Sequence, residues 1–582
     1  MDSKTVIAYI LILVIIFLTP FYYNYFFESP EPPPADTVSV AQDTVAPQPT
    51  QDTLTRPQQE LTEPALQAQE PREEELSVAP ERIDTLIVET SRFWIGLTNI
   101  GGGTIYSVKL KNYHGPDGSP YVELIPSYAR HVLGFSTTGF EGQTVDYQNQ
   151  PFRIINLNEF NSSDTVQISQ PTPVKFEYTT SEGGTLTRTL TFFPDRYHIG
   201  LTVTLHQFQD IIANRQYELF WNSGMAITEG NATDDLNYSK AYSLLGDDLV
   251  DIDASKAKPG NPATESFEGT TRWVAVRNKY FTSIITPVSR NAIGMHLSGT
   301  LLSREDYDLK RYNANLIMPY QETAVQQDSF FVYIGPLDYD VLTDYSRHFE
   351  RMMNFGWTII RPISKAVLWA FTTMHNYIPN YGLVLILFGV VVKILVFPLT
   401  KKSYVSMKSM QTLQPKIQEL RDKYKDDSQK MNQEMMKLYK EHGVNPMGGC
   451  LPMLLQMPLL YALFIVFRST IELRGAEFIL WIKDLSQPDT VFTLPFSLPL
   501  YGAQVNILPL IMAVTMILQQ RVSATGTGSQ QQKMMMWFMP ILFLLIFNNF
   551  PSGLNLYYAL FNIMTIIQQK WFIDIPTGTA QE

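Results

Sequence analysis

The chain is poor in cysteine, in basic residues and in the signatures of enzyme sites. Its 582 residues include one cysteine, Cys450, so it can form neither an internal disulfide bond nor a thiolate cage for a metal ion. The 44 lysines and arginines are outnumbered by 56 aspartates and glutamates, and the net charge of −12 argues against nucleic-acid binding by the whole chain. The motifs H-E-x-x-H, G-x-x-x-x-G-K-[ST] and G-x-S-x-G do not occur. We therefore expect a protein that is not an enzyme and that holds no cofactor and no metal.

Acidic residues are also missing from the apolar segments of the C-terminal third, which argues against aspartyl intramembrane proteolysis and acid-based proton coupling. Asp248, Asp251 and Asp253 resemble part of a calcium loop, but the sixth-position glycine and twelfth-position glutamate of an EF-hand are lacking. A solvated acidic turn is the simpler interpretation.

The N-terminal part predicts a membrane anchor followed by a flexible linker. Residues 1–27 contain an apolar run from Val6 that is long enough to span a bilayer, with aromatic residues at its end. Because no small-residue cleavage site follows, we expect an uncleaved signal anchor, and a cleaved signal peptide is the alternative. Residues 28–82 are rich in Pro, Gln, Glu and Thr and predict a linker that does not fold.

Residues 83–340 have the two-residue period of β-strands. Apolar and polar residues alternate clearly within 185–192 and 198–205, and glycine-containing turn sequences separate such segments. The pattern predicts a β-sandwich of about 250 residues.

Residues 341–378 have a helical period. The predicted apolar face consists of Ile359, Ile363, Val367, Ala370 and Met374. Trp357 and Trp369 suit a helix that lies in the headgroup plane of a membrane, and an ordinary buried helix is the alternative.

Five further membrane spans are predicted within a C-terminal core region, residues 379–572, near 381–399, 451–468, 505–520, 534–550 and 554–570. Segment 401–446 carries ten basic residues against six acidic ones, so we place it in the cytoplasm. Together with the anchor, this gives six transmembrane helices with both termini in the cytoplasm and the β-rich domain in a periplasm. Residues 573–582 form a short C-terminal tail.

Lys393 lies inside the apolar run of the first of these five spans. A lysine at the centre of a membrane helix costs roughly 2.5–3.5 kcal/mol on insertion scales. The nearest cytoplasmic marker, Lys401, is eight residues away, or about 12 Å along a helix. Snorkelling towards the cytoplasm is one interpretation, and a polar groove that opens into the membrane from one side is the other.

Uncharged polar and flexible apolar side chains in the other spans favour the groove. We expect these residues to contact a substrate: Gln456, Met457, Pro458, Leu460, Phe464, Gln519, Gln520, Tyr557, Tyr558 and Asn562. Flexible methionines would let such a trough accept many sequences. Hydrogen bonding between helices is the alternative role for the polar residues.

Segment 401–446 predicts a helical hairpin with a polar turn near Asp426. It is either a pair of charged helices that pack only on each other, or a basic arm that docks a ribosome or a nascent chain. The basic docking candidates are Lys416, Arg421, Lys423, Lys425, Lys437 and Lys440.

Several short blocks, in order, resemble the YidC-type membrane protein insertases. The blocks are 397–400 (FPLT), 413–417 (LQPKI), 445–450 (NPMGGC), 455–458 (LQMP), 480–485 (LWIKDL) and 550–554 (FPSGL). The anchor, linker and external β-domain, with 333–336 (YIGP) near its end, resemble the Gram-negative form.

The resemblance implies a polytopic α-helical protein of the bacterial inner membrane, with a five-helix insertase core and a periplasmic β-supersandwich. It also implies an insertase and chaperone that acts on nascent membrane proteins alone or beside the Sec translocon, with transient ribosome contact. Family contact positions correspond to Met457, Pro458 and Tyr558. The family's groove usually carries an arginine where this chain has Lys393, which keeps the charge but loses the planar fork that binds carboxylates bidentately.

Together with this resemblance, the residues favour a membrane protein insertase with Lys393 as the charge of its groove. A solute channel or transporter is a second possibility, although no second intramembrane charge supports it. A third is a tethered binding protein whose β-domain is the working part, and deletion of residues 90–320 separates this from an insertase.

Overall fold

The computed structural model describes residues 84–156, 165–258, 260–304, 307–424, 427–443, 451–498, 501–523 and 530–571. The predicted anchor, linker and C-terminal tail lie outside these ranges, as do Lys425 and Cys450. Contacts within the chain group residues Ile417–Leu438 separately from the other described residues, so these two parts are considered individually.

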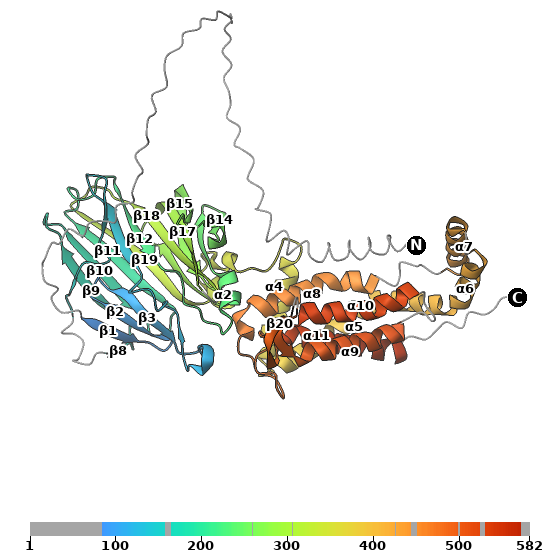
Figure 1. The fold of residues 1–582 in the computed structure, drawn as a ribbon. Helices are drawn as coiled ribbons and strands as arrows, with labels where there is room; N and C mark the ends of the chain where they lie inside the picture. Colours follow the sequence, from blue (N-terminus) through green and yellow to red (C-terminus); the bar gives the residue numbers. More distant parts are fainter. Residues whose placement is uncertain are drawn as a thin grey trace, which may run out of the picture. The chain divides into compact units, whose positions relative to one another are not determined.

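The first half of the described chain forms two β-sheets (Figure 1). One sheet has the strand order β4-β3-β2-β1-β8. Its strands are β1 (Thr85–Glu89), β2 (Phe93–Thr98), β3 (Thr104–Leu110), β4 (Val122–Glu123) and β8 (Thr165–Gln167).

The larger sheet has 14 strands along the path β6-β5-β12-β18-β17-β15-β16-β19-β11-β10-β9-β7, with β13 and β14 attached through β15. Its strands are β5 (Gly134–Thr138), β6 (Thr144–Asp146), β7 (Arg153–Ile154), β9 (Thr172–Thr179), β10 (Thr185–Phe192), β11 (His198–His206), β12 (Gln216–Trp221), β13 (Lys240–Leu245), β14 (Asp248–Ile252), β15 (Ala263–Arg277), β16 (Phe281–Pro287), β17 (Ala292–Ser303), β18 (Asp308–Pro319) and β19 (Val325–Pro336).

The alternation seen in the sequence sets the two faces of this sheet. β10 pairs antiparallel with β11, and Leu186 and Leu205 lie opposite each other on the buried side. Arg188 shares that side although it is charged. Its guanidinium donates hydrogen bonds to the carbonyl oxygens of Gly101 at 2.5 Å and Leu133 at 2.9 Å. Burial lowers the pKa of Arg188 to about 9.

The predicted acidic turn is part of this domain. Asp251 forms an ion pair with Lys240 at 2.7 Å, and Asp253 forms one with Lys310 at 3.1 Å. In the part of the chain that the structure describes, no group of three or more metal-binding side chains is found. The charges of Asp251 and Asp253 are therefore balanced by lysines.

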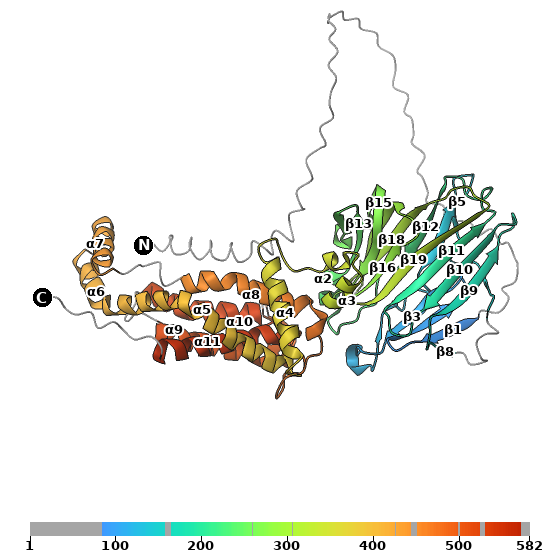
Figure 2. The ribbon, with the colours of Figure 1, turned by 180° about the vertical axis from the view of Figure 1, so that it is seen from behind.

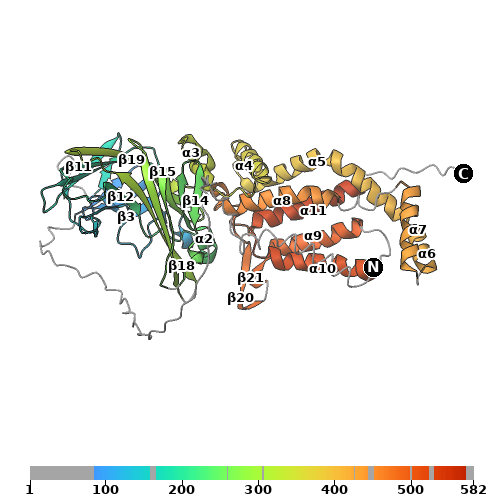
Figure 3. The same cartoon turned by 90° about the horizontal axis from the view of Figure 1, so that it is seen from above.

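The second half is mainly helical: α8 and α11 lie beside α5, and α9 lies beside α11 and α10 (Figures 2 and 3). The α-helices are α2 (Ala232–Tyr238), α3 (Tyr339–Asp344), α4 (Arg361–His375), α5 (Tyr381–Thr412), α6 (Gln414–Lys423), α7 (Ser428–Glu441), α8 (Leu451–Ser469), α9 (Ile507–Ser523), α10 (Gln530–Phe547) and α11 (Ser552–Trp571). Short 3-10 helices are η1 (Pro116–Gly118), η3 (Ala254–Lys256), η4 (Phe349–Met352) and η6 (Ile471–Leu473), and a hairpin is formed by β20 (Thr490–Leu498) and β21 (Gly502–Asn506).

One helical stretch of the described residues, Tyr381–Lys401, is both long and apolar enough to cross a membrane by itself. Gln456–Ser469, Ile507–Val522 and Trp537–Phe547 are apolar but shorter. A helical C-terminal region is therefore present as predicted, whereas the number of six spans is not confirmed.

One predicted helix boundary differs from the structure, and a second helix can be compared with its predicted apolar face. Helix α5 does not end near residue 400 but continues without a break to Thr412, so the predicted hairpin begins inside it. In α4 the buried side chains are Ser364, Val367, Leu368 and Phe371. Within the predicted apolar face, Val367 is buried, whereas Ile363, Ala370 and Met374 are half-buried. Ile359 precedes α4 and is exposed. The location of this face at the headgroup plane stays a prediction.

Candidate functional site

Helices α5 and α11 approach each other closely where α5 has a glycine. A Cβ atom at Gly389 would lie 3.2 Å from Leu560 and 3.8 Å from the ring of Tyr557. Small residues allow such close approach between membrane helices. The next residue of α5 on the same side, one turn later, is Lys393.

The ammonium group of Lys393 is enclosed by side chains of α11. The residue is 9% exposed, and its Nζ donates a hydrogen bond of 2.7 Å to Oγ1 of Thr565. Nζ also lies 3.7 Å from the centroid of the Phe561 ring, which is a favourable cation–π position. The Thr565 hydroxyl in turn donates to the carbonyl oxygen of Phe561 at 2.7 Å. The charge thus has a fixed location between two helices.

Tyr404 completes this arrangement from α5 itself. Its ring centroid lies 6.0 Å from Nζ of Lys393. Eleven residues separate Lys393 and Tyr404, about three helical turns, so both lie on one side of α5. We call Lys393, Tyr404, Phe561 and Thr565 the lysine cluster.

Sequence reasoning identified Lys393 but did not select its three partners. The available signals were the one-turn spacing of Phe561 and Thr565 and the three-turn spacing of Lys393 and Tyr404. These spacings indicate shared helix faces, but they do not reveal that α5 and α11 pack on each other.

The predicted contact residues of α11 point to different neighbours. Tyr557 is fully buried next to Gly389 and Phe561, on the side of the lysine cluster. Tyr558 is half-buried and lies 5.4 Å from Phe547 of α10, measured between ring centroids. Asn562 donates a hydrogen bond of 3.2 Å to Thr515 of α9.

The predicted contact residues of α8 and α9 are mostly half-buried. In α8, Gln456, Met457, Pro458 and Phe464 are half-buried and Leu460 is buried. The ring of Phe464 packs against Phe550, with 4.9 Å between centroids. Gln519 and Gln520 are half-buried near the end of α9. Their role in substrate contact stays a prediction.

The basic docking candidates that the structure describes lie along α6 and α7. Lys416, Lys423, Lys437 and Lys440 are exposed, and Arg421 is half-buried. Nζ of Lys416 lies 3.2 Å from Nε2 of His442.

Comparisons with known proteins identify the family. The family model "YidC periplasmic domain" matches residues 86–370, and the model "60Kd inner membrane protein" matches residues 373–577. A membrane protein insertase YidC of Chlorobium limicola is 37% identical over 87% of this chain and 85% of that protein. One of Chlorobaculum tepidum is 38% identical over 85% of this chain and 82% of that protein. The chain belongs to the YidC family of membrane protein insertases.

A solved structure described as an active YidC insertase with its first transmembrane domain resolved is also similar. The match covers 85% of this chain and 95% of that chain, with 17% identity and a TM-score of 0.35. The family assignment rests on the family models and the sequence relatives. It identifies an inner-membrane insertase with a periplasmic β-rich domain and a helical C-terminal region. It also confirms the expectation that the chain is not an enzyme.

Proposed function

We propose that the lysine cluster is the polar element with which this insertase lowers the barrier for a substrate segment entering the membrane. The observation that carries this proposal is the position of Nζ of Lys393, 2.7 Å from Thr565 and 3.7 Å from the Phe561 ring. Lys393 lies in Tyr381–Lys401, the described helical stretch that is long and apolar enough to cross a membrane. A charge in that position is costly, and such charges commonly mark a functional path in membrane proteins.

The chemistry of lysine suggests what the cluster does. An ammonium group has three N–H donors, and the bond to Thr565 uses one of them. The others can bind water or acidic and carbonyl groups of a translocating polypeptide tail. Such binding keeps polar groups solvated while the adjoining apolar segment moves into lipid. Because the lysine charge is compact, we propose general electrostatic attraction rather than bidentate recognition of carboxylates.

The remaining elements have supporting roles in this proposal. A groove open to the cytoplasm and to lipid would be bordered by Met457, Leu460, Phe464, Tyr557 and Tyr558. Six spans with both termini in the cytoplasm would place the insertase core at 379–572 and the periplasmic domain at 83–340, joined by an interfacial region at 341–378. Helices α6 and α7, with their exposed lysines, would dock nascent chains or ribosomes, and the Sec translocon would be a partner for some substrates.

The test is insertion of a single-span substrate with an acidic translocated tail, measured by protease protection in cells depleted of their own insertase. Lys393→Ala should reduce insertion at least tenfold, and Lys393→Arg should retain most of it. Lys570→Ala is the matched control, because Lys570 is an exposed lysine near the end of α11. Equal insertion by wild type and Lys393→Ala, at equal protein levels, would contradict the proposal.

A further inference from the structure

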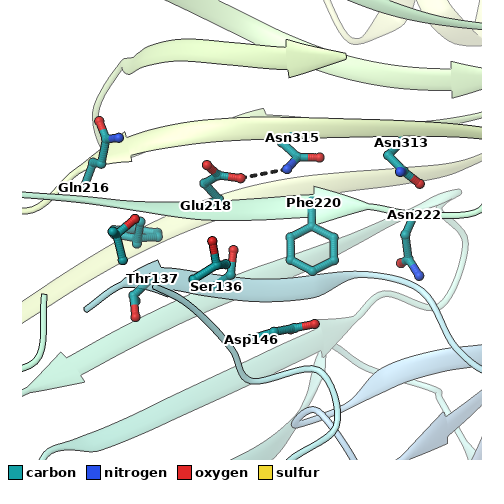
Figure 4. A pocket seen from close by; sticks show the side chains of 12 residues that line it. Ser136, Thr137, Asp146, Gln216, Glu218, Phe220, Asn222, Asn313 and Asn315 are labelled. Atoms are coloured by element: carbon teal, nitrogen blue, oxygen red, sulfur yellow. Dashed lines mark hydrogen bonds between the residues drawn. The ribbon is translucent and has the colours of Figure 1, made fainter. Parts of the chain in front are cut away.

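The outer face of the large β-sheet contains a polar pocket that the insertase mechanism does not use. Strand register places Asp146 of β6, Ser136 of β5 and Glu218 of β12 in one row. The next row contains Gly134, Phe220 of β12 and Asn315 of β18. The cavity above these rows has a volume of about 300 Å³, within the size range of small-ligand sites (Figure 4).

The lining excludes several ligand classes. None of the 12 lining residues is a lysine or an arginine, and two of them, Asp146 and Glu218, are carboxylic acids. Phosphates and other anions would therefore meet only like charge. The lining consists otherwise mainly of hydroxyl and amide side chains, so it also does not suit a lipid tail.

One flat apolar surface lies among these polar groups. Phe220 is half-buried, and its ring covers the backbone of Gly134 so closely that a Cβ atom at Gly134 would lie 2.2 Å from it. A residue with a Cβ atom at position 134 would clash with the ring, so Gly134 allows the Phe220 ring to lie against the sheet.

The polar side chains beside the ring are held in fixed positions. Nδ2 of Asn315 donates a hydrogen bond of 2.7 Å to Glu218, as Figure 4 shows. The amide oxygen of Asn313 accepts from the backbone of Ser223 at 3.0 Å, and its nitrogen donates to Ser298 at 3.2 Å. Preformed geometry of this kind lowers the entropic cost of binding a polar ligand.

Asp146 and Glu218 stand on strands that are separated by β5, so their backbones are about 10 Å apart at the spacing of neighbouring β-strands. Oδ1 of Asp146 accepts from the backbone N–H of Gln148 at 2.8 Å, which leaves Oδ2 as a further acceptor. Glu218 accepts a hydrogen bond from Asn315 through Oε2, which leaves Oε1 of Glu218 as a further acceptor. Two acceptors in the row next to the Phe220 ring can each bind a hydroxyl group of one extended, hydroxyl-rich molecule.

We propose that this pocket binds an uncharged carbohydrate of two or three pyranose rings. One sugar ring packs its C–H face on Phe220, and its hydroxyl groups donate hydrogen bonds to Glu218 and Asp146 and accept from the amide groups. Sugars combine an apolar face with a rim of hydroxyl groups, and the pocket offers a complementary surface to both. This activity is independent of the lysine cluster.

The experiment uses the full chain in nanodiscs of phosphatidylethanolamine and phosphatidylglycerol, because glycoside detergents would compete for the pocket. Saturation-transfer NMR with maltotriose and with diacetylchitobiose as probes should show transfer to the ring C–H protons of at least one sugar. Phe220→Ala and the isosteric Glu218→Gln should each weaken its binding at least tenfold. Phe267→Ala is the matched control, since Phe267 is an exposed phenylalanine of β15 in the same sheet and outside the pocket, and binding should be unchanged.

Absence of saturation transfer to both sugars, each supplied at 10 mM, would overturn the proposal. Unchanged sugar binding by the Glu218→Gln variant would also overturn it. Binding of spermidine that is lost in Glu218→Gln, with no sugar binding, would instead assign the pocket to organic cations and would also overturn it. Insertion activity should be normal in all three variants, so the outcome is separate from that of the Lys393 test.

Discussion

Nε of Arg474 donates a hydrogen bond of 2.6 Å to Oε1 of Glu229, a residue 245 positions earlier in the chain. Arg474 directly follows η6, beyond the end of α8, and Glu229 precedes α2 in the β-rich domain. The two side chains are 10% and 7% exposed. The guanidinium also donates to the carbonyl oxygens of His114 and Thr228, so the pair is both buried and well satisfied.

Arg474→Ala should destabilise the protein strongly, because Glu229 would remain buried without its cation. Loss of one partner of a buried pair typically costs about 3–5 kcal/mol. The measurement is thermal unfolding in nanodiscs, followed by tryptophan fluorescence. The matched control is Arg153→Ala, because Arg153 pairs with Glu177 at 3.1 Å but has an exposed side chain. Removal of that exposed pair should change stability by less than about 1 kcal/mol, and similar losses in both variants would contradict the argument.

Pairs between residues far apart in the chain show which structural features could not be predicted from the sequence alone. The alternation from Ile199 to Leu205 was enough to predict a strand and its buried side, because the period of a strand is a local property. The lone charge of Lys393 was equally visible. In contrast, its bond to Thr565 joins residues 172 positions apart and depends on which helices pack together. The same applies to Arg188, whose burial depends on the carbonyl groups of two distant loops.

The ionisation of the Glu472 carboxyl group should make the stability of the protein depend on pH. This residue of η6 is half-buried, and its Oε2 is a buried atom with no hydrogen-bond partner among the described residues. Burial, together with the nearby carboxyl group of Asp338, raises the pKa of Glu472 to about 8. In the unfolded chain the pKa is near 4.3, so between about pH 4.5 and 8 the folded state binds the additional proton. Stability therefore falls as the pH rises through this window.

The melting temperature of wild type should drop by several degrees between pH 5 and pH 8 in nanodiscs. Glu472→Gln, which stays neutral, should reduce this drop and should be more stable than wild type at pH 8. Glu322→Gln serves as the control, since Glu322 lies in an exposed ion pair with Arg215 and should keep the wild-type slope. An unchanged slope in Glu472→Gln would show that this carboxyl group is already ionised at pH 5.

Thr565→Val tests the hydrogen bond within the lysine cluster while keeping the charge and the side-chain volume. We expect insertion to fall several-fold, less than in Lys393→Ala, because the ammonium group loses its acceptor at 2.7 Å but keeps the Phe561 ring. The readout is the protease-protection assay described above. Thr515→Val is the matched control, because Thr515 is also a buried threonine but bonds to Asn562 of α11 rather than to Lys393. If both threonine variants insert equally well, the position of the ammonium group is not set by Thr565.

Deletion of residues 90–320 should leave most insertion activity in place, although it removes Glu229 and every strand of the periplasmic sheets except β1 and β19. The helical region should remain folded, because the deletion also removes the surface that buries Arg474. This arginine then becomes hydrated instead of remaining buried without a partner. Glu229→Ala alone keeps that surface, including the ring of Phe281 at 5.4 Å from the guanidinium, and should therefore give a less stable protein than the deletion does. Insertion and melting temperature measured for both variants would check the order. Loss of insertion in the deletion variant, with the helical region still folded, would instead make the β-rich domain the working part of the molecule.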